Sequence, residues 1–135
     1  MKQYLLMLLA LVCLLSACGG GEPAQEETVV TTFQQISQEE ARTIMATNQE
    51  AVILDVRTRE EYDSGHIKGA VLLPVDEITE ENAREVIPAK DTQVLVYCRS
   101  GNRSVTASKA LALLGYTEVY EFGGINTWPY ETETW

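Results

Sequence analysis

The amino-acid sequence predicts an α/β fold, in which a central and mostly parallel sheet is covered by helices on both faces. Short apolar segments alternate along the chain with segments of helical pattern, which is the order of elements in such folds. The apolar segments lack polar alternation, and strands that are apolar on both sides are typical of a sheet buried on both faces. The 135 residues are enough for one domain and too few for two.

The first half of the predicted domain contains two helices and two strands. In a capping box, a Ser or Thr side chain and a Glu three residues later each satisfy a free backbone N–H group at a helix start. This pattern occurs twice and predicts helices over residues 37–47 and 58–65, the second ending at Gly65. Buried strands are predicted at residues 51–56, AVILDV, and at residues 70–74, AVLLP.

The second half repeats this order of elements. Residues 79–87 predict a short helix that Pro88 ends, and residues 92–97, TQVLVY, predict a central strand. A further helix is expected over residues 104–114, where the following glycine stops it. The last strand is expected at residues 118–122, EVYEF, directly before two glycines.

The N-terminal segment predicts export. Residues 1–17 have the layout of a signal peptide, because a basic start precedes an apolar run too short to span a bilayer as a mature helix. Residues 15–18, LSAC, resemble the lipobox of bacterial lipoproteins. The resemblance implies that Cys18 is lipidated and anchors the protein to the bacterial membrane, on its periplasmic or extracellular face. The alternative is an ordinary signal peptide that is cut nearby.

The segment after this cysteine is expected to link the anchor to the domain. Residues 18–32 are rich in glycine, then acidic and rich in threonine, with little to bury, so we expect a flexible tether. The folded domain is expected to occupy residues 33–135. The sequence predicts no oligomeric state.

Charge is unevenly distributed along the chain. The net charge of −10 argues against nucleic acid as a general partner. Residues 92–117 contain no acid, whereas Arg99, Arg103 and Lys109 lie within them. Lys109 alone fits a chance surface charge. The two arginines flank a glycine beside a cysteine, and this arrangement indicates an anion site.

The cysteines single out one thiol. Cys13 would leave with the signal peptide and Cys18 would carry lipid, so Cys98 would be the only thiol that remains. An unpaired cysteine in an oxidising compartment points to a reactive group. The alternative is a buried and inert cysteine at the end of a strand.

The segment that follows the central strand, CRSGNRS, predicts an anion-binding nucleophile. Ligands bind beyond the carboxyl ends of strands in parallel sheets, which is where Cys98 is expected. A polar turn before a helix aims backbone N–H groups into one concavity, and the free helix start adds positive potential, so the sulfur would be held as thiolate. Gly101 lets the backbone curl, and Ser104 is expected to cap the helix. The expected anion-binding residues are Arg99, Ser100, Gly101, Asn102, Arg103 and Ser104.

Three motifs resemble the single-domain rhodaneses: CRSGNRS, LDVRTREEYDSGHIKGA upstream and GYTEVYEFGGINTW downstream. The resemblance covers about residues 33–130. It implies that Cys98 takes a sulfane sulfur from a donor such as thiosulfate, releases sulfite and holds the sulfur as a persulfide. The sulfur would then pass to a thiol, to cyanide or to another acceptor. We expect no cofactor and no metal.

Loop length separates this family from its relatives. The phosphatase branch of the fold has a longer loop, and cysteine phosphatases place an arginine six positions after the nucleophile, where this chain has Ser104. Arg99 suits a dianion such as thiosulfate, because a guanidinium pairs with oxyanions through two parallel hydrogen bonds. Two alternatives stay open: a non-catalytic binding module of the same fold, and a cysteine phosphatase or arsenate reductase.

The upstream motif contributes four candidate residues. The resemblance implies that they mostly hold the fold and the wall of the active-site pocket. His66, the only histidine, invites a general-base role, but a histidine in such a turn is more often a structural hydrogen-bonding group. Near the chain end, Trp128 and Tyr130 either line the pocket mouth or close the core, and we favour the core. The four residues are Asp55, Arg57, Glu61 and His66.

Overall fold

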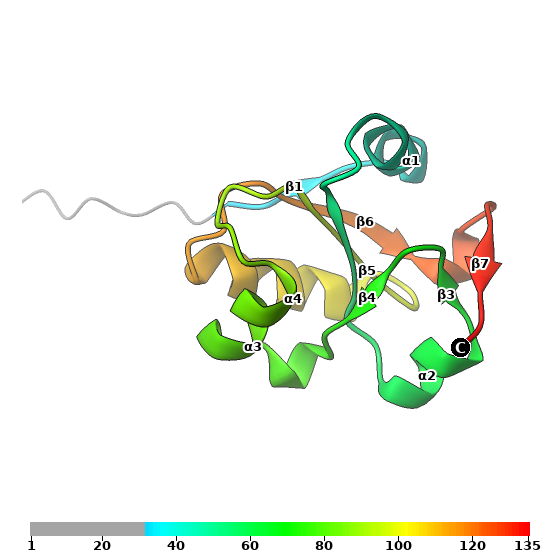
Figure 1. Ribbon diagram of the computed structural model, residues 1–135. Coiled ribbons are helices and arrows are strands. Elements are labelled where there is room, and N and C mark those ends of the chain that lie inside the picture. The colour runs from blue at the N-terminus through cyan, green and yellow to red at the C-terminus, as the bar shows by residue number, and fades with distance from the viewer. Residues whose placement is uncertain (1–31) are drawn as a thin grey trace, which may run out of the picture.

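A five-stranded parallel sheet with the strand order β1-β6-β5-β2-β4 forms the centre of the computed structural model, which describes residues 32–135 (Figure 1). Helix α1 covers one face of this sheet, and α3 and α4 lie on the other. Helix α2 lies toward β3 and β7, and its buried residue Tyr62 packs in the same cluster as Ala41 of α1. The predicted fold class is therefore confirmed. The strands are β1 Gln34–Gln35, β2 Val52–Asp55, β4 Val71–Leu72, β5 Val94–Cys98 and β6 Val119–Gly124.

The signal peptide expected at residues 1–17, the lipidated Cys18 and nearly all of the expected tether lie outside the described residues. None of the helices within residues 32–135 is long and apolar enough to cross a membrane.

The capping boxes start the first two helices as the sequence predicts. Helices α1, Gln38–Thr47, and α2, Arg59–Ser64, each begin with a Ser or Thr hydroxyl that accepts from the backbone N–H of a Glu three residues later. The carboxylate of that Glu in turn accepts from the backbone N–H of the Ser or Thr. The second pair is Thr58 and Glu61, and this cap fixes the backbone next to the Glu61 carboxylate. Helix α3, Glu80–Val86, lies close to its expected range.

Helix α4, Asn102–Leu113, begins two residues before the expected start. The prediction that Ser104 caps this helix is wrong, because Gly101 is the N-cap residue and no side chain caps the helix there. Gly101 adopts a left-handed conformation with φ 101°, which turns the loop directly into the helix. Ser104 consequently lies within the first turn of α4, and its side chain is buried.

Very short elements lack the periodicity that predicts longer ones. The sequence does not predict β1, or the antiparallel pair β3, His66–Ile67, and β7, Thr132–Glu133. Two single-turn 3₁₀ helices, η2 Val75–Glu77 and η3 Ile125–Thr127, complete the fold. Two residues are too few for an alternating pattern, so these elements form only where neighbouring structure supplies their partners.

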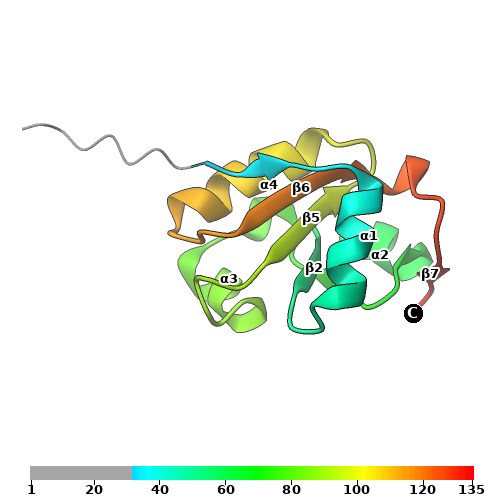
Figure 2. The same ribbon diagram turned by 90° about the horizontal axis from the view of Figure 1, so that it is seen from above.

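Alternation along β5 assigns each of its side chains to one of two hydrophobic clusters. All five residues of β5 are buried, and the strand pairs with β2 on one side and with β6 on the other (Figure 2). Leu95 and Tyr97 belong to the cluster beneath α1, whereas Val94, Val96 and Cys98 belong to the cluster on the α4 side. The pleat of the strand therefore directs the Cys98 side chain toward α4.

Candidate active site

Cys98 ends β5 and begins the loop that leads into α4. It is a free cysteine, and only 1% of its surface is exposed. The backbone N–H of Gly101 donates to Sγ at 3.1 Å, and the Ser104 hydroxyl oxygen lies 3.5 Å from Sγ. The sulfur therefore lies inside a curl of its own loop, as the sequence predicts.

The surroundings of the sulfur favour its ionised form. Burial raises the pKa of the Cys98 thiol, because charge is costly away from water. The hydrogen bond between the sulfur and the Ser104 hydroxyl, and those from the backbone N–H groups of Ser104, Gly101 and Ser100, act in the opposite direction and prevail, so the pKa lies below its ordinary value. A buried and inert cysteine would have a raised pKa. Cys98 therefore fits the reactive alternative.

The loop keeps its shape because its backbone lies against the end of β6. A Cβ atom added at Gly124 would lie 2.1 Å from the Arg99 carbonyl oxygen and 2.7 Å from the Ser100 Cα. The N–H of Asn126 donates to the same Arg99 carbonyl at 3.2 Å. Gly124 pairs with Cys98 in the sheet register. Only glycine permits this contact, which ties the cysteine loop to the neighbouring strand.

The two arginines of the loop have different surroundings. Arg103 forms two parallel hydrogen bonds to the Glu61 carboxylate, at 2.8 and 2.9 Å. The bond from Arg103 is the largest cause that lowers the pKa of Glu61 to about 2. Arg99 is exposed, and within residues 32–135 it makes no ion pair. Arg99 is therefore the arginine of the loop that can meet an incoming anion, while Arg103 braces α4 against α2.

The remaining loop residues divide by exposure. Ser100 and Asn102 are exposed, Gly101 is partly buried, and Ser104 is fully buried. Among these, the backbones of Ser100 and Gly101 and both the backbone and the side chain of Ser104 bond to the sulfur. Of the six loop residues that the sequence singled out, the structure thus brings Ser100, Gly101 and Ser104 to the sulfur. Arg99 and Asn102 are exposed, and Arg103 bonds to Glu61 instead.

Asp55 and Arg57 form a buried ion pair at the carboxyl end of β2. The guanidinium group bonds to Asp55 at 2.7 Å and to the Gly65 carbonyl at 2.7 Å. The Tyr97 hydroxyl donates to the same carboxylate at 2.6 Å and accepts from the Ile67 N–H at 3.0 Å. Burial and the nearby Asp55 charge raise the pKa of Tyr97, which therefore keeps its proton. The network joins β2 and β5 to the end of α2 and to β3.

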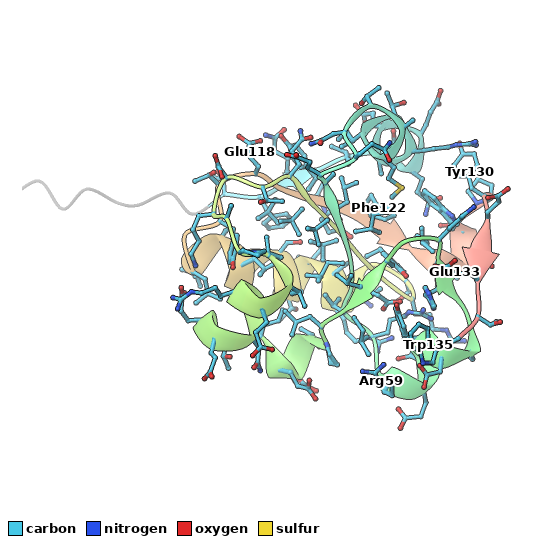
Figure 3. All side chains as sticks on the ribbon, in the orientation of Figure 1. Arg59, Glu118, Phe122, Tyr130, Glu133 and Trp135 are labelled. Carbon is cyan, nitrogen blue, oxygen red and sulfur yellow. The ribbon has the colours of Figure 1, made fainter. Side chains whose placement is uncertain are left out.

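His66 is also engaged by the protein. Its ring stacks on Tyr62 at 3.8 Å, and Nδ1 lies 2.8 Å from the Tyr62 carbonyl oxygen. Nε2 lies 3.4 Å from a carboxylate oxygen of Glu133, which Figure 3 labels on β7. Both ring nitrogens thus face protein oxygens, and the ring is 2% exposed. This geometry fits the structural interpretation of His66 and leaves no ring nitrogen for a substrate.

Sequence reasoning missed Glu121, a buried carboxylate on β6. The Ser104 hydroxyl donates to its Oε1 at 2.6 Å, and only 4% of Glu121 is exposed. The available signal was an acid inside a strand of apolar pattern, two residues before the glycine pair. A buried charge on a central strand needs hydrogen-bonding partners, which only the neighbouring elements supply.

The chain-end aromatic residues do not line the cysteine loop. Trp128 packs against the cluster beneath α1, with its ring centroid 5.5 Å from that of Phe122. Trp128 and Tyr130 also border a cavity of about 670 Å³ between α1 and the chain end. That cavity includes neither Cys98 nor any residue of its loop. The sulfur instead lies in the concavity of the loop itself.

A strand-end thiol inside a curl of N–H donors, on a five-stranded parallel sheet, fits a rhodanese-like domain. The family model described as rhodanese-like domain matches residues 37–130, and the chain belongs to this family. The thiosulfate sulfurtransferase PspE of Escherichia coli (strain K12) is 40% identical over 72 residues, which cover 53% of this chain and 68% of PspE.

Two further comparisons agree with the family. The thiosulfate sulfurtransferase GlpE of Coxiella burnetii (strain RSA 493 / Nine Mile phase I) is 34% identical over 97 residues, which cover 71% of this chain and 87% of GlpE. A solved structure described as a rhodanese with anions from E. coli superposes with a TM-score of 0.59 at 32% identity. It covers 63% of this chain and 99% of that one.

Replacing Gly124 with alanine tests the contact that holds the loop. We expect Gly124→Ala to lower the free energy of unfolding by about 2 to 3 kcal/mol, because two backbones must move apart. The pKa of Cys98 should rise as its N–H donors shift, measured as the midpoint of iodoacetamide reactivity against pH. In the control Gly115→Ala, only strain at φ 92° is introduced, with open space around the new methyl group. The control should lose stability and keep the midpoint, and an unchanged midpoint in Gly124→Ala would contradict the role of this contact.

Proposed function

We propose that this protein is a sulfurtransferase that moves a sulfane sulfur from thiosulfate or a similar donor to a thiophilic acceptor through a persulfide on Cys98. The observation that carries the proposal is the free thiol with lowered pKa, surrounded by the N–H groups of its loop. The sulfurtransferase names of PspE and GlpE support the same chemistry.

Each half-reaction exchanges one sulfur–sulfur bond. The Cys98 thiolate attacks the outer sulfur of thiosulfate, the S–S bond of thiosulfate breaks, and sulfite leaves with the electron pair. The outer sulfur of the resulting persulfide carries a negative charge, which the N–H groups of the loop stabilise. An acceptor thiolate or cyanide then attacks this outer sulfur, and Cys98 leaves as thiolate. No separate base is required, because the loop already favours the thiolate.

The two alternatives predict a different site. A non-catalytic binding module has no need of a cysteine with lowered pKa. A cysteine phosphatase places an arginine at the position that Ser104 occupies, where its guanidinium would contact the phosphoryl oxygens. Here the Ser104 side chain is buried against Glu121, and Arg103 is committed to Glu61. The geometry therefore favours sulfur transfer over both.

Mass spectrometry after treatment with thiosulfate is the direct test. We expect the purified protein to gain one sulfur atom on Cys98 and to release sulfite. Cys98→Ser should gain none and release none, because the nucleophile is lost, while its circular dichroism and melting stay close to those of the unmodified protein. Substantial sulfite release by the Cys98→Ser variant would place the chemistry elsewhere.

Arg99→Ala tests the anion contact at the mouth of the loop. We expect the KM for thiosulfate to rise about tenfold or more, since a charge-assisted contact contributes about 1.5 to 3 kcal/mol. The effect should shrink at high salt, because Arg99 is exposed. Lys109→Ala removes the same charge from the exposed side of α4 and should leave the KM nearly unchanged. Equal KM values for Arg99→Ala and the unmodified protein would rule out thiosulfate binding by Arg99.

We further propose that the protein is exported and lipid-anchored through Cys18. The support is the apolar run that ends in the residues LSAC. Full-length protein expressed in bacteria should be labelled by a fatty acid and should partition with membranes, whereas Cys18→Ser should not be labelled. Cys13→Ser, inside the apolar run, is the matched control and should keep the label. Membrane association of an unlabelled Cys18→Ser variant would refute lipid anchoring.

A further inference from the structure

Glu121 is a buried acid that the sulfur chemistry described so far does not use. Its Oε1 accepts hydrogen bonds from the Ser104 hydroxyl at 2.6 Å and from the Gly123 N–H at 2.8 Å. Its Oε2 accepts from the Gln35 amide at 3.2 Å. Donors from α4, β6 and β1 therefore fix the carboxylate in one orientation, with Oε1 toward Ser104.

Ser104 lies between this carboxylate and the nucleophile. A serine hydroxyl has a single proton to donate. Its oxygen is 2.6 Å from Glu121 Oε1 and 3.5 Å from Cys98 Sγ. The short contact with the carboxylate holds the hydroxyl proton, so the thiol donates to the hydroxyl oxygen rather than accepting from it. The three groups form a chain in which S–H donates to O–H and O–H donates to the carboxylate.

We propose that Glu121 is a positioning residue that sets the nucleophilic strength of Cys98 by holding the Ser104 hydroxyl proton away from the sulfur. The inference rests on the proposed function, because it assigns Glu121 a role in both half-reactions of sulfur transfer.

Glu121 raises the pKa of the Cys98 thiol through two physical effects. Its negative charge disfavours a second negative charge on the nearby sulfur. It also competes for the hydroxyl proton: once the thiol has ionised, the Ser104 hydroxyl can turn this proton to the sulfur and lower the thiol pKa, and Glu121 weakens that bond without abolishing it. Glu121 thus keeps the thiolate more basic than the backbone N–H groups alone would make it.

A more basic thiolate changes the two half-reactions in opposite directions. The nucleophilicity of a thiolate increases with its pKa, with a Brønsted coefficient of about 0.4 to 0.5. Attack on the outer sulfur of thiosulfate is therefore faster with Glu121 present. A thiolate of higher pKa is a poorer leaving group, so transfer of the persulfide sulfur to the acceptor is slower. Glu121 would therefore balance capture of the sulfur against its release.

The test replaces Glu121 with glutamine, which keeps the shape of the side chain and removes its charge. The other charged groups around the loop stay in place: Arg99, Arg103 with its partner Glu61, and Asp55. We expect the midpoint of iodoacetamide reactivity against pH to fall by about one pH unit. Glu118→Gln is the matched control. Glu118 lies just before the start of β6, whereas Phe122, the neighbour of Glu121, lies toward its other end (Figure 3). The control should keep the midpoint.

A second variant separates the path through Ser104 from a direct effect of charge. In a Ser104→Ala background, Glu121→Gln should shift the midpoint by less than half as much, because the hydroxyl that Glu121 holds is gone. A full shift in that background would show that Glu121 acts without Ser104 and would overturn the proposal. If Glu121→Gln does not fold, Glu121→Asp, which withdraws the carboxylate from the hydroxyl, should lower the midpoint by a smaller amount. An unchanged midpoint in a folded variant at position 121 would overturn the proposal as well.

Single-turnover rates above both midpoints test the consequence for sulfur transfer. With a midpoint lowered by about one pH unit, persulfide formation from thiosulfate should slow about threefold in Glu121→Gln, and transfer of the persulfide sulfur to cyanide should accelerate. Rates that change in the same direction would contradict the balance. The iodoacetamide midpoint needs only a free thiol. Failure of the unmodified protein to form a persulfide would therefore refute the proposed function and leave the assignment of Glu121 to be judged by the midpoint.

Discussion

The contact between Gly124 and the backbone of Arg99 and Ser100 is the constraint on which the candidate site depends. The loop after a parallel strand has no partner in the sheet, and its N–H groups converge on a sulfur only if something fixes its path. Here the end of β6 fixes it, because Gly124 pairs with Cys98 and allows the Arg99 carbonyl to lie where a side chain would otherwise be. The N–H of Asn126 donates a hydrogen bond to the same carbonyl. The cradle around the sulfur is thus a property of two adjacent strands rather than of the loop alone.

The sulfur is stabilised mainly by fixed dipoles, because the nearest charges are largely compensated. Arg103 is paired with Glu61, and Glu121 receives three hydrogen bonds. The hydrogen bonds that lower the pKa of Cys98 are one with the Ser104 hydroxyl and several from backbone N–H groups. Dipoles held by the fold do not need to reorganise when charge develops on the sulfur. Arg99, which is exposed, remains available for an anion. Different groups therefore perform the two tasks: Arg99 provides positive potential at the mouth of the loop, and the dipoles of the loop stabilise the sulfur.

The buried polar network on the opposite side of the sheet has a structural task. Asp55, Arg57 and Tyr97 join the ends of β2 and β5 to the end of α2 and to β3. Removal of one member would leave a buried charge or donor uncompensated, which is far more costly than the net gain from the pair. Because Tyr97 precedes Cys98, this network also fixes the last residues of the strand that carries the nucleophile.

The sequence by itself determined the features that depend on local pattern. The two capping boxes, the apolar strand before Cys98 and the polar loop after it are all readable over a few residues, and they predict both the fold class and the reactive thiol. The tertiary structure alone decided which of these residues meet. Glu61 and Arg103 are 42 positions apart, and Ser104 and Glu121 are 17 apart.

The errors have the same physical origin. The sequence predicts that Ser104 caps α4, because a serine near a helix start usually bonds to the free N–H groups of that start. In the folded protein Gly101 turns the chain into the helix two residues earlier than the expected start, and Glu121 on the next strand takes the serine hydroxyl. The partner of a buried polar side chain is set by which strands lie side by side, and local sequence carries no record of that pairing.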